Sequence, residues 1–310
     1  MRRRQFFTNL GLAAGAAALT TTHQAHAAAP VPATAPRTYV LIHGAWHSAL
    51  HWARIVRLLS ARGHRVVALD LPGHGLSARF PRAYLGADRA AFAAEVSPQK
   101  DLRLDDAADL VIAALRELQG PSRPIVVGHS MGGTVITRVG ERAPELVGRL
   151  VYLTAYCPVR RGPTSAYGEL PEARHAKVDG LMLGDPGKTG VVRIDPRGDA
   201  NYRALLRAGF YHDVPEDEFL AFALALTPDL PLGYWTTDVG ATKERWGSLP
   251  RTFIRCTDDR ALPLALQDLM IREADAWTPT HRFDRKTLKT SHSPFASAPE
   301  ALTALLHELP

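Results

Sequence analysis

Short, unbroken apolar runs alternate along this chain with longer segments in which apolar residues recur every three or four positions. A short apolar run bounded by turn residues is typical of a buried strand, and the longer spacing is typical of an amphipathic helix. The first helix predicted in this way carries Trp52, Ile55 and Leu59 on one face and ends at Gly63. Strands that alternate with helices indicate an α/β protein whose mostly parallel sheet is covered by helices on both faces. The predicted strands are residues 38–42, 65–69, 125–127, 150–154 and 252–255, with a last one near 281–285, and a second helix is predicted over 105–118.

Residues 160–245 interrupt this alternation, because they are rich in proline, glycine and aromatic residues. One helix is predicted among them. Asp213 and Glu216 have the spacing of a capping box, and Phe219 and Phe222 fall on the apolar face that follows. We interpret 160–245 as a cap inserted between two parts of the core, residues 37–159 and 246–310. The alternative is a long irregular loop, which compact domains rarely carry without a function.

The first 27 residues have the pattern of an export signal. A basic start precedes an apolar stretch over residues 10–19 and a small-x-small sequence at 25–27. Arg3 and Arg4, followed by a polar and two apolar residues, resemble the twin-arginine signal. We expect residues 1–27 to direct export to the periplasm or the outside of the cell, with 28–36 as a linker. The alternatives are a plain secretory signal or an uncleaved anchor.

Composition narrows the possible partners. The chain has 310 residues with 46% hydrophobic and 22% charged, which is typical of a soluble globular protein, and three of its six excess positive charges lie in the first 27 residues. Since no basic run remains, we expect no nucleic-acid partner. No later apolar stretch approaches the roughly 18 residues of a membrane span, so we expect no stable membrane insertion after signal removal. Cys157 and Cys256 are expected to be buried thiols rather than a disulfide pair.

No metal-binding motif, dinucleotide fingerprint or phosphate loop is present in the sequence. We therefore expect no cofactor and no metal, and a small molecule as the partner. The oligomeric state is left open by the sequence.

The sequence Gly-His-Ser-Met-Gly at residues 128–132 carries the strongest chemical signal. It follows the predicted strand 125–127 and precedes a helical run, which is the setting of a nucleophile elbow. In such an elbow a strained turn presents the serine hydroxyl at the carboxyl edge of the sheet and at a helix N-terminus. The sequence therefore predicts Ser130 as a nucleophile.

A serine nucleophile needs a base, an acid that orients the base, and donors for the oxyanion. His292 follows the last predicted strand and precedes a terminal helix, so it is the predicted base. Asp258 and Asp259 follow the strand 252–255, and adjacent side chains point in opposite directions, so only one is expected to reach His292. The predicted oxyanion donors are the backbone N–H groups of Met131 and of Ala45, which lies in the loop after the first strand.

Several segments resemble the α/β hydrolases, in particular the branch of EstC-like bacterial carboxylesterases, plant methylesterases and plant hydroxynitrile lyases. They are residues 40–46, 68–75, 149–155, 257–263 and 292–295, and the likeness covers about 37–310. The resemblance implies Ser130, Asp259 and His292 as a triad and Ala45 and Met131 as the oxyanion hole. It selects Asp259 because the family's acid directly precedes an Arg-Ala-x-Pro run, matched here at 260–263.

The lyases of this branch carry a threonine and a lysine where this chain has Gly44 and Ser293, so the resemblance is to the esterase side. We expect a hydrolase that cleaves carboxylic esters of small, largely apolar molecules through an acyl-enzyme, with Trp46, Phe219 and Phe222 contacting the substrate. The alternatives on the same scaffold are amide hydrolysis, a lyase or a cyclase-type step. A ligand-binding relative without catalysis is a further alternative, which the intact Ser, Asp and His disfavour.

Overall fold

The computed structural model describes residues 35–310, so the predicted export signal and all but the last two residues of the predicted linker lie outside it. One sheet contains six strands in the order β2-β1-β3-β4-β7-β8, and each neighbouring pair is parallel. The predicted parallel sheet is therefore confirmed. Its strands are β1 Thr38–Ile42, β2 Arg65–Leu69, β3 Ile125–His129, β4 Arg149–Leu153, β7 Arg251–Cys256 and β8 Asp284–Leu288.

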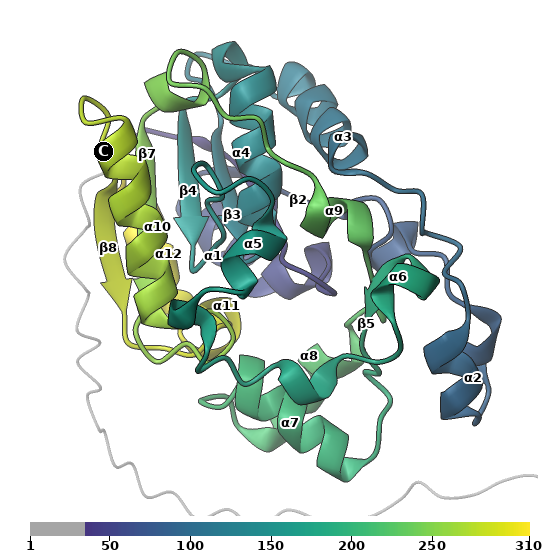
Figure 1. Ribbon diagram of the computed structural model, residues 1–310. Coiled ribbons are helices and arrows are strands. Elements are labelled where there is room, and N and C mark those ends of the chain that lie inside the picture. The colour runs from purple at the N-terminus through teal and green to yellow at the C-terminus, as the bar shows by residue number, and fades with distance from the viewer. Residues whose placement is uncertain (1–34) are drawn as a thin grey trace, which may run out of the picture. The chain divides into compact units, whose positions relative to one another are not determined.

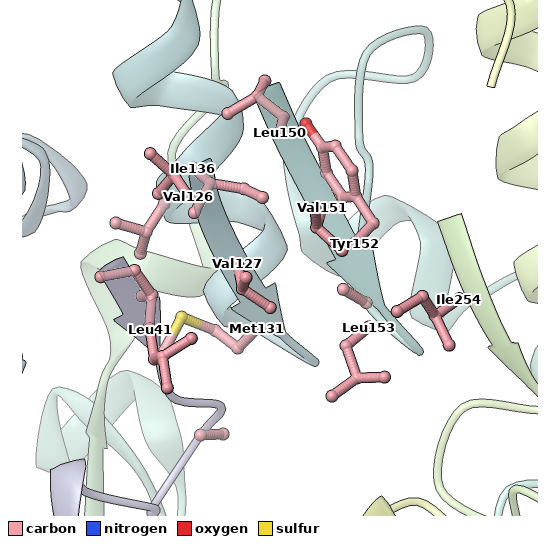
Figure 2. Close-up of a cluster of buried hydrophobic side chains, with 14 of the residues drawn as sticks. Leu41, Val126, Val127, Met131, Ile136, Leu150, Val151, Tyr152, Leu153 and Ile254 are labelled. Carbon is pink, nitrogen blue, oxygen red and sulfur yellow. The ribbon is translucent and has the colours of Figure 1, made fainter. Parts of the chain in front are cut away.

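The central strands are buried because they are almost wholly apolar on both faces. In the pairing register, Leu41, Val127, Val151 and Ile254 share one face, and Val126, Leu150 and Tyr152 share the other. On this second face Val126 lies beside Ile136 of the helix that follows β3 (Figure 2). The side chains of successive strands thus interlock into one core.

Helices cover both faces of the sheet. On one face α3 packs on α4, which also contacts β1, β3 and β4; on the other, α1 packs on α12. The helices of the core are α1 Ala53–Ser60, α2 Arg89–Ala94, α3 Leu104–Glu117, α4 Gly132–Arg142, α10 Leu264–Trp277, α11 Pro294–Ser297 and α12 Pro299–His307. None of the helices within 35–310 has the length and apolar character needed to cross a membrane.

The chain between β4 and β7 contains five α-helices, three 3-10 helices and a two-stranded antiparallel sheet. Its helices α7 and α8 lie beyond the carboxyl ends of the core strands (Figure 1). Arg193 and Asp229 form an ion pair with both side chains fully buried, and Ser97 of the core also donates to Asp229. The elements are α5 Thr164–Gly168, α6 Pro186–Thr189, β5 Val191–Arg193, α7 Ala200–Phe210, α8 Glu216–Leu224, β6 Asp229–Pro231 and α9 Leu232–Thr236.

Two local predictions are wrong. The last strand runs over Asp284–Leu288 rather than 281–285. It is an edge strand whose residues alternate between half-buried and exposed up to the buried Leu288, so it has no apolar run. The helix α8 begins as predicted near Glu216, but its N-cap is Pro215 and no capping box forms. Asp213 instead accepts a hydrogen bond from the backbone N–H of Ser291 at 2.7 Å, so its carboxylate serves a tertiary contact.

Candidate active site

Ser130 lies in the turn between β3 and α4, at the carboxyl edge of the sheet. Its φ of 53° is in the left-handed region that a residue with a side chain rarely adopts. The flanking glycines are required by close packing. A Cβ on Gly128 would lie 2.7 Å from the carbonyl oxygen of Gly132, and one on Gly132 would lie 2.6 Å from the carbonyl oxygen of His43. The turn is therefore strained and tightly enclosed, as a nucleophile elbow requires.

His292 and Asp259 meet at the same edge of the sheet, after β8 and β7. The His292 Nδ1 and Asp259 Oδ2 atoms are 2.6 Å apart, and their side chains are 2% and 0% exposed. Asp258 is exposed, and its carboxylate accepts only a 3.2 Å hydrogen bond from the Thr257 hydroxyl. The structure thus brings Asp259, and not Asp258, to the imidazole.

The Asp259 carboxylate is held by three further donors. Its Oδ1 accepts from the backbone N–H groups of Ala261 and Leu262 at 2.7 and 2.8 Å, and its Oδ2 also accepts from the Thr154 hydroxyl. These two turn amides donate to Asp259 and not to Asp258. Thr154 directly follows β4, and no sequence motif marked it as a partner of the acid. Four donors fix the orientation of this carboxylate before any substrate binds.

The predicted oxyanion donors lie on two neighbouring loops. Ala45 follows β1, and Met131 follows Ser130 directly. Within residues 35–310 neither backbone N–H donates a hydrogen bond to another residue. A Cβ on Gly44 would lie 2.7 Å from Cβ of Ser130, so the first loop approaches the nucleophile as closely as a glycine allows. Two free N–H donors therefore flank the serine.

A cavity of about 450 Å³ contains Ser130, His292, Ala45 and Met131 in its lining. Among the described residues that line it there is no Asp, Glu, Lys or Arg. The remaining lining residues are mostly apolar and include Trp46, Tyr156, Phe210, Leu232, Trp235 and Leu262. A larger groove of about 730 Å³ near the amino-terminal ends of β3 and β4 contains none of the predicted site residues. The 450 Å³ cavity is therefore the candidate active site.

Of the three predicted substrate contacts, Trp46, Phe219 and Phe222, only Trp46 lines the cavity. Phe219 and Phe222 do not line the cavity; their rings pack against Tyr211, with centroids 5.6 and 5.8 Å away. The aromatic residue that reaches the cavity from this region is Phe210, whose ring lies 5.6 Å from that of His292. The apolar face of α8 is covered by the end of α7, so helical periodicity identified buried residues but not which helix faces the site.

Buried histidines other than His292 surround the site, and burial disfavours their charged form. Burial, and next the neighbouring His292, hold the pKa of His129 well below its ordinary value. A carbonyl oxygen only accepts, so His129 donates from Nε2 to the His292 carbonyl oxygen, 2.8 Å away. No motif in the sequence marked this hydrogen bond. The backbone of His292 is therefore held by His129 on one side and, through Ser291, by Asp213 on the other.

Both cysteines are buried and free, as expected. Burial raises the pKa of the Cys157 thiol to about 12 and raises that of Cys256 as well. Neither thiol is therefore ionised near neutral pH. In the described part of the chain no group of three or more His, Cys, Asp or Glu residues is arranged to hold a metal ion.

Comparison with known proteins places this chain in a family. The sequence model of the Alpha/beta hydrolase family matches residues 39–305. Methyl jasmonate esterase 1 of Vitis vinifera is 27% identical, with 88% of this chain and 96% of that protein covered. Putative methylesterase 15, chloroplastic, of Arabidopsis thaliana is 24% identical. The matched region covers 88% of this chain but only 56% of that longer protein. A pyrethroid hydrolase from Sphingobium faniae has the same fold, with a TM-score of 0.66, 23% identity and coverage of 87% and 95%. The resemblance to the methylesterase branch is confirmed, the names support a carboxylesterase-type hydrolase, and the chain belongs to the alpha/beta hydrolase family.

Proposed function

We propose that this carboxylesterase-type hydrolase cleaves carboxylic esters of small, largely apolar molecules through an acyl-enzyme on Ser130. The observation that carries the proposal is the lining of the 450 Å³ cavity. The cavity is lined by Ser130, by His292 and by the two loops whose N–H groups are free. Asp259 accepts a hydrogen bond from Nδ1 of His292. These are the parts that acyl transfer requires.

The hydrogen bond to Asp259 sets the proton positions. A carboxylate only accepts, so Nδ1 of His292 carries the proton and Nε2 is free to act as the base. Ser130 Oγ attacks the carbonyl carbon of the ester while its proton passes to Nε2. The tetrahedral intermediate then expels the alcohol, which takes that proton, and the acyl group remains on Ser130. Water repeats the sequence and releases the acid.

Charge stabilisation in this mechanism comes from the N–H groups of Ala45 and Met131. Each is directed to an oxygen that is negative only in the intermediate, and removal of one such donor typically costs about 3–4 kcal/mol. The cavity around them is apolar, so water competes weakly for these donors.

The size and charge of the cavity support a neutral, largely apolar substrate. A volume of about 450 Å³ is in the range of small-molecule sites. No charged side chain among the described lining residues would offset the desolvation of an ionic substrate. The names of the relatives, a methyl jasmonate esterase and a pyrethroid hydrolase, also support apolar esters.

The position of Gly44 favours the esterase over a cyanohydrin lyase. The lyases of the resembling branch use a threonine there, and a Cβ at Gly44 would lie 2.7 Å from Cβ of Ser130 and 2.8 Å from Nδ1 of His129. A threonine therefore does not fit this loop as it stands. Ser293 also cannot supply the ammonium group that the lyases carry at that position.

The test is turnover of a panel of nitrophenyl esters, together with labelling by a fluorophosphonate probe. We expect turnover of apolar acyl esters, and probe label on Ser130 located by peptide mass spectrometry. Charged acyl groups of equal size are the matched comparison and are expected to react far more slowly. An unlabelled Ser130, or no turnover of any ester, would contradict the proposal.

We also propose export through the twin-arginine pathway, supported by Arg3, Arg4 and the apolar stretch that follows. Protein recovered outside the cytoplasm is expected to begin near Ala28. Arg3→Lys together with Arg4→Lys is expected to keep the protein inside, whereas the control Arg2→Lys leaves export unchanged. Cytoplasmic protein that retains Met1 would contradict this proposal.

A further inference from the structure

We propose that His47 and Tyr211 are positioning residues, through which the cap segment (residues 160–245) holds the Ala45 N–H in place for the oxyanion. This inference rests on the proposed esterase function. Neither residue lines the cavity, so both act through the loop after β1 rather than on the substrate.

His47 joins the loop to the cap by two side-chain contacts. Its Nδ1 lies 2.7 Å from the Ala45 carbonyl oxygen, and its Nε2 lies 2.7 Å from the Tyr211 hydroxyl oxygen. A carbonyl oxygen only accepts, so Nδ1 carries the proton. The ring is neutral, because burial and the neighbouring His51 and His129 hold the pKa of His47 well below its ordinary value. Nε2 is therefore an acceptor, and the Tyr211 O–H donates to it.

The same residue also controls the peptide that carries the Ala45 N–H. The backbone N–H of His47 donates to the Gly44 carbonyl oxygen at 3.3 Å. That carbonyl and the Ala45 N–H belong to one planar peptide and point in opposite directions. The His43 Nδ1 contacts the same carbonyl at 2.8 Å, and because its Nε2 accepts from Leu71, it is the donor. Both peptide planes that flank Ala45 are thus held, one by the backbone of His47 and the other by its ring.

Trp46, the residue after Ala45, explains why this loop needs support. Trp46 has a φ of 62°, a left-handed conformation that costs about 1 kcal/mol or more for a residue with a side chain. The cap holds this residue as well. The Trp46 carbonyl oxygen accepts from the Thr227 backbone N–H at 2.8 Å and from its hydroxyl at 3.1 Å, and Trp46 Nε1 donates to the Val192 carbonyl oxygen at 2.9 Å. Three cap residues, Val192, Tyr211 and Thr227, therefore hold the strained loop.

Loss of this support is expected to lower kcat more than it raises KM. The oxyanion exists only in the intermediate and transition state, so a displaced donor affects the chemical step rather than ground-state binding. Removing an oxyanion donor lowers the rate by about 10²–10³. A donor that is present but free to rotate stabilises the oxyanion less well, so the rate falls by part of that factor. We expect a decrease of about 10- to 100-fold in kcat for His47→Leu, and a smaller decrease for Tyr211→Phe.

Three variants test the role of the hydrogen bonds. His47→Leu removes both side-chain contacts, and Tyr211→Phe removes only the hydroxyl. His47→Asn places an amide N–H near the position of Nδ1 and is expected to restore much of the rate lost in His47→Leu. The matched control is Tyr234→Phe, because Tyr234 is also a buried cap tyrosine that donates to a core carbonyl, that of Pro72 at 2.9 Å, and makes no hydrogen bond to residues 44–47.

The measurements are kcat and KM on one apolar nitrophenyl ester, and the affinity for an apolar boronic acid that forms a tetrahedral adduct on Ser130. We expect boronate affinity to fall in parallel with kcat/KM in His47→Leu and Tyr211→Phe, while Tyr234→Phe behaves as the wild type. If Tyr211→Phe retains the wild-type kcat and boronate affinity, or if Tyr234→Phe loses as much, the inference is wrong. Failure of this inference is distinguishable from failure of the proposed function, because the latter is tested on the wild type, by ester turnover and by probe label on Ser130.

Discussion

Replacement of Asp259 by asparagine perturbs the candidate site at one atom. Asp259 Oδ1 accepts from the N–H groups of Ala261 and Leu262, and an asparagine carbonyl oxygen can keep both hydrogen bonds. The amide NH₂ then takes the place of Oδ2, 2.6 Å from His292 Nδ1. Since an NH₂ group only donates, Nδ1 must accept, and the imidazole proton moves to Nε2. His292 can then no longer take the proton of Ser130.

The size of the effect follows from the tautomer. The same substitution in a serine protease triad leaves the geometry intact and lowers kcat by about 10⁴. That corresponds to about 5.4 kcal/mol in the activation free energy, at about 1.36 kcal/mol per tenfold change. Asp258→Asn is the matched control. The Asp258 side chain is exposed, and its carboxylate accepts only from Thr257 at 3.2 Å, so an effect within about 0.5 kcal/mol is expected.

The assay is turnover of one activated nitrophenyl ester by the two purified variants, with circular dichroism to check folding. An activated ester is preferred because its leaving group needs little help from a general acid, so the measured loss reports mainly on Ser130 activation. A severe loss in Asp258→Asn beside near-normal turnover in Asp259→Asn would reverse the assignment. Equal and small losses in both variants would show that neither carboxylate orients His292.

Four further outcomes are expected. Ser130→Ala should lower ester turnover by about 10⁴–10⁶ and abolish fluorophosphonate labelling with an unchanged melting temperature, and retention of more than a few per cent of the rate would show that the nucleophile is misassigned. Gly44→Ala should lower kcat at least tenfold, because its Cβ would lie 2.7 Å from Cβ of Ser130. The wild type should release no cyanide from mandelonitrile above the uncatalysed rate, and cyanide release above that rate would support the lyase. The protein should lose stability as the pH falls from about 6.5 toward 4, because burial lowers the pKa of His51 and His74 to about 4 while the unfolded chain takes up protons at these residues near 6.5. Each contributes about 1.4 kcal/mol per pH unit in this range, so urea unfolding at pH 7 and pH 5 should give the lower free energy at pH 5, and equal values would contradict the reasoning.

Local patterns along the chain were enough for the parallel sheet and for the main parts of the site. The strands β1 and β2 were predicted to the residue, since each is a short, mostly apolar run that can be recognised without its partner strand. Ser130 was identifiable because the nucleophile elbow is a local turn, whose glycines are required by contacts within a few residues. Asp259 and His292 were found from their positions after strands, and Asp259 was separated from Asp258 by the resemblance.

The tertiary structure decided which side chains meet around that site. No pattern near Tyr211 or Thr227 indicates that they hold the loop of Ala45, because the partners in these contacts are separated by more than 160 residues. Phe219 and Phe222 share the apolar face of α8. Only the tertiary structure shows that this face packs against Tyr211 and that Phe210 lines the cavity instead. Periodicity shows that a helix face is buried. The element that covers this face is distant in sequence, so its identity depends on the whole fold.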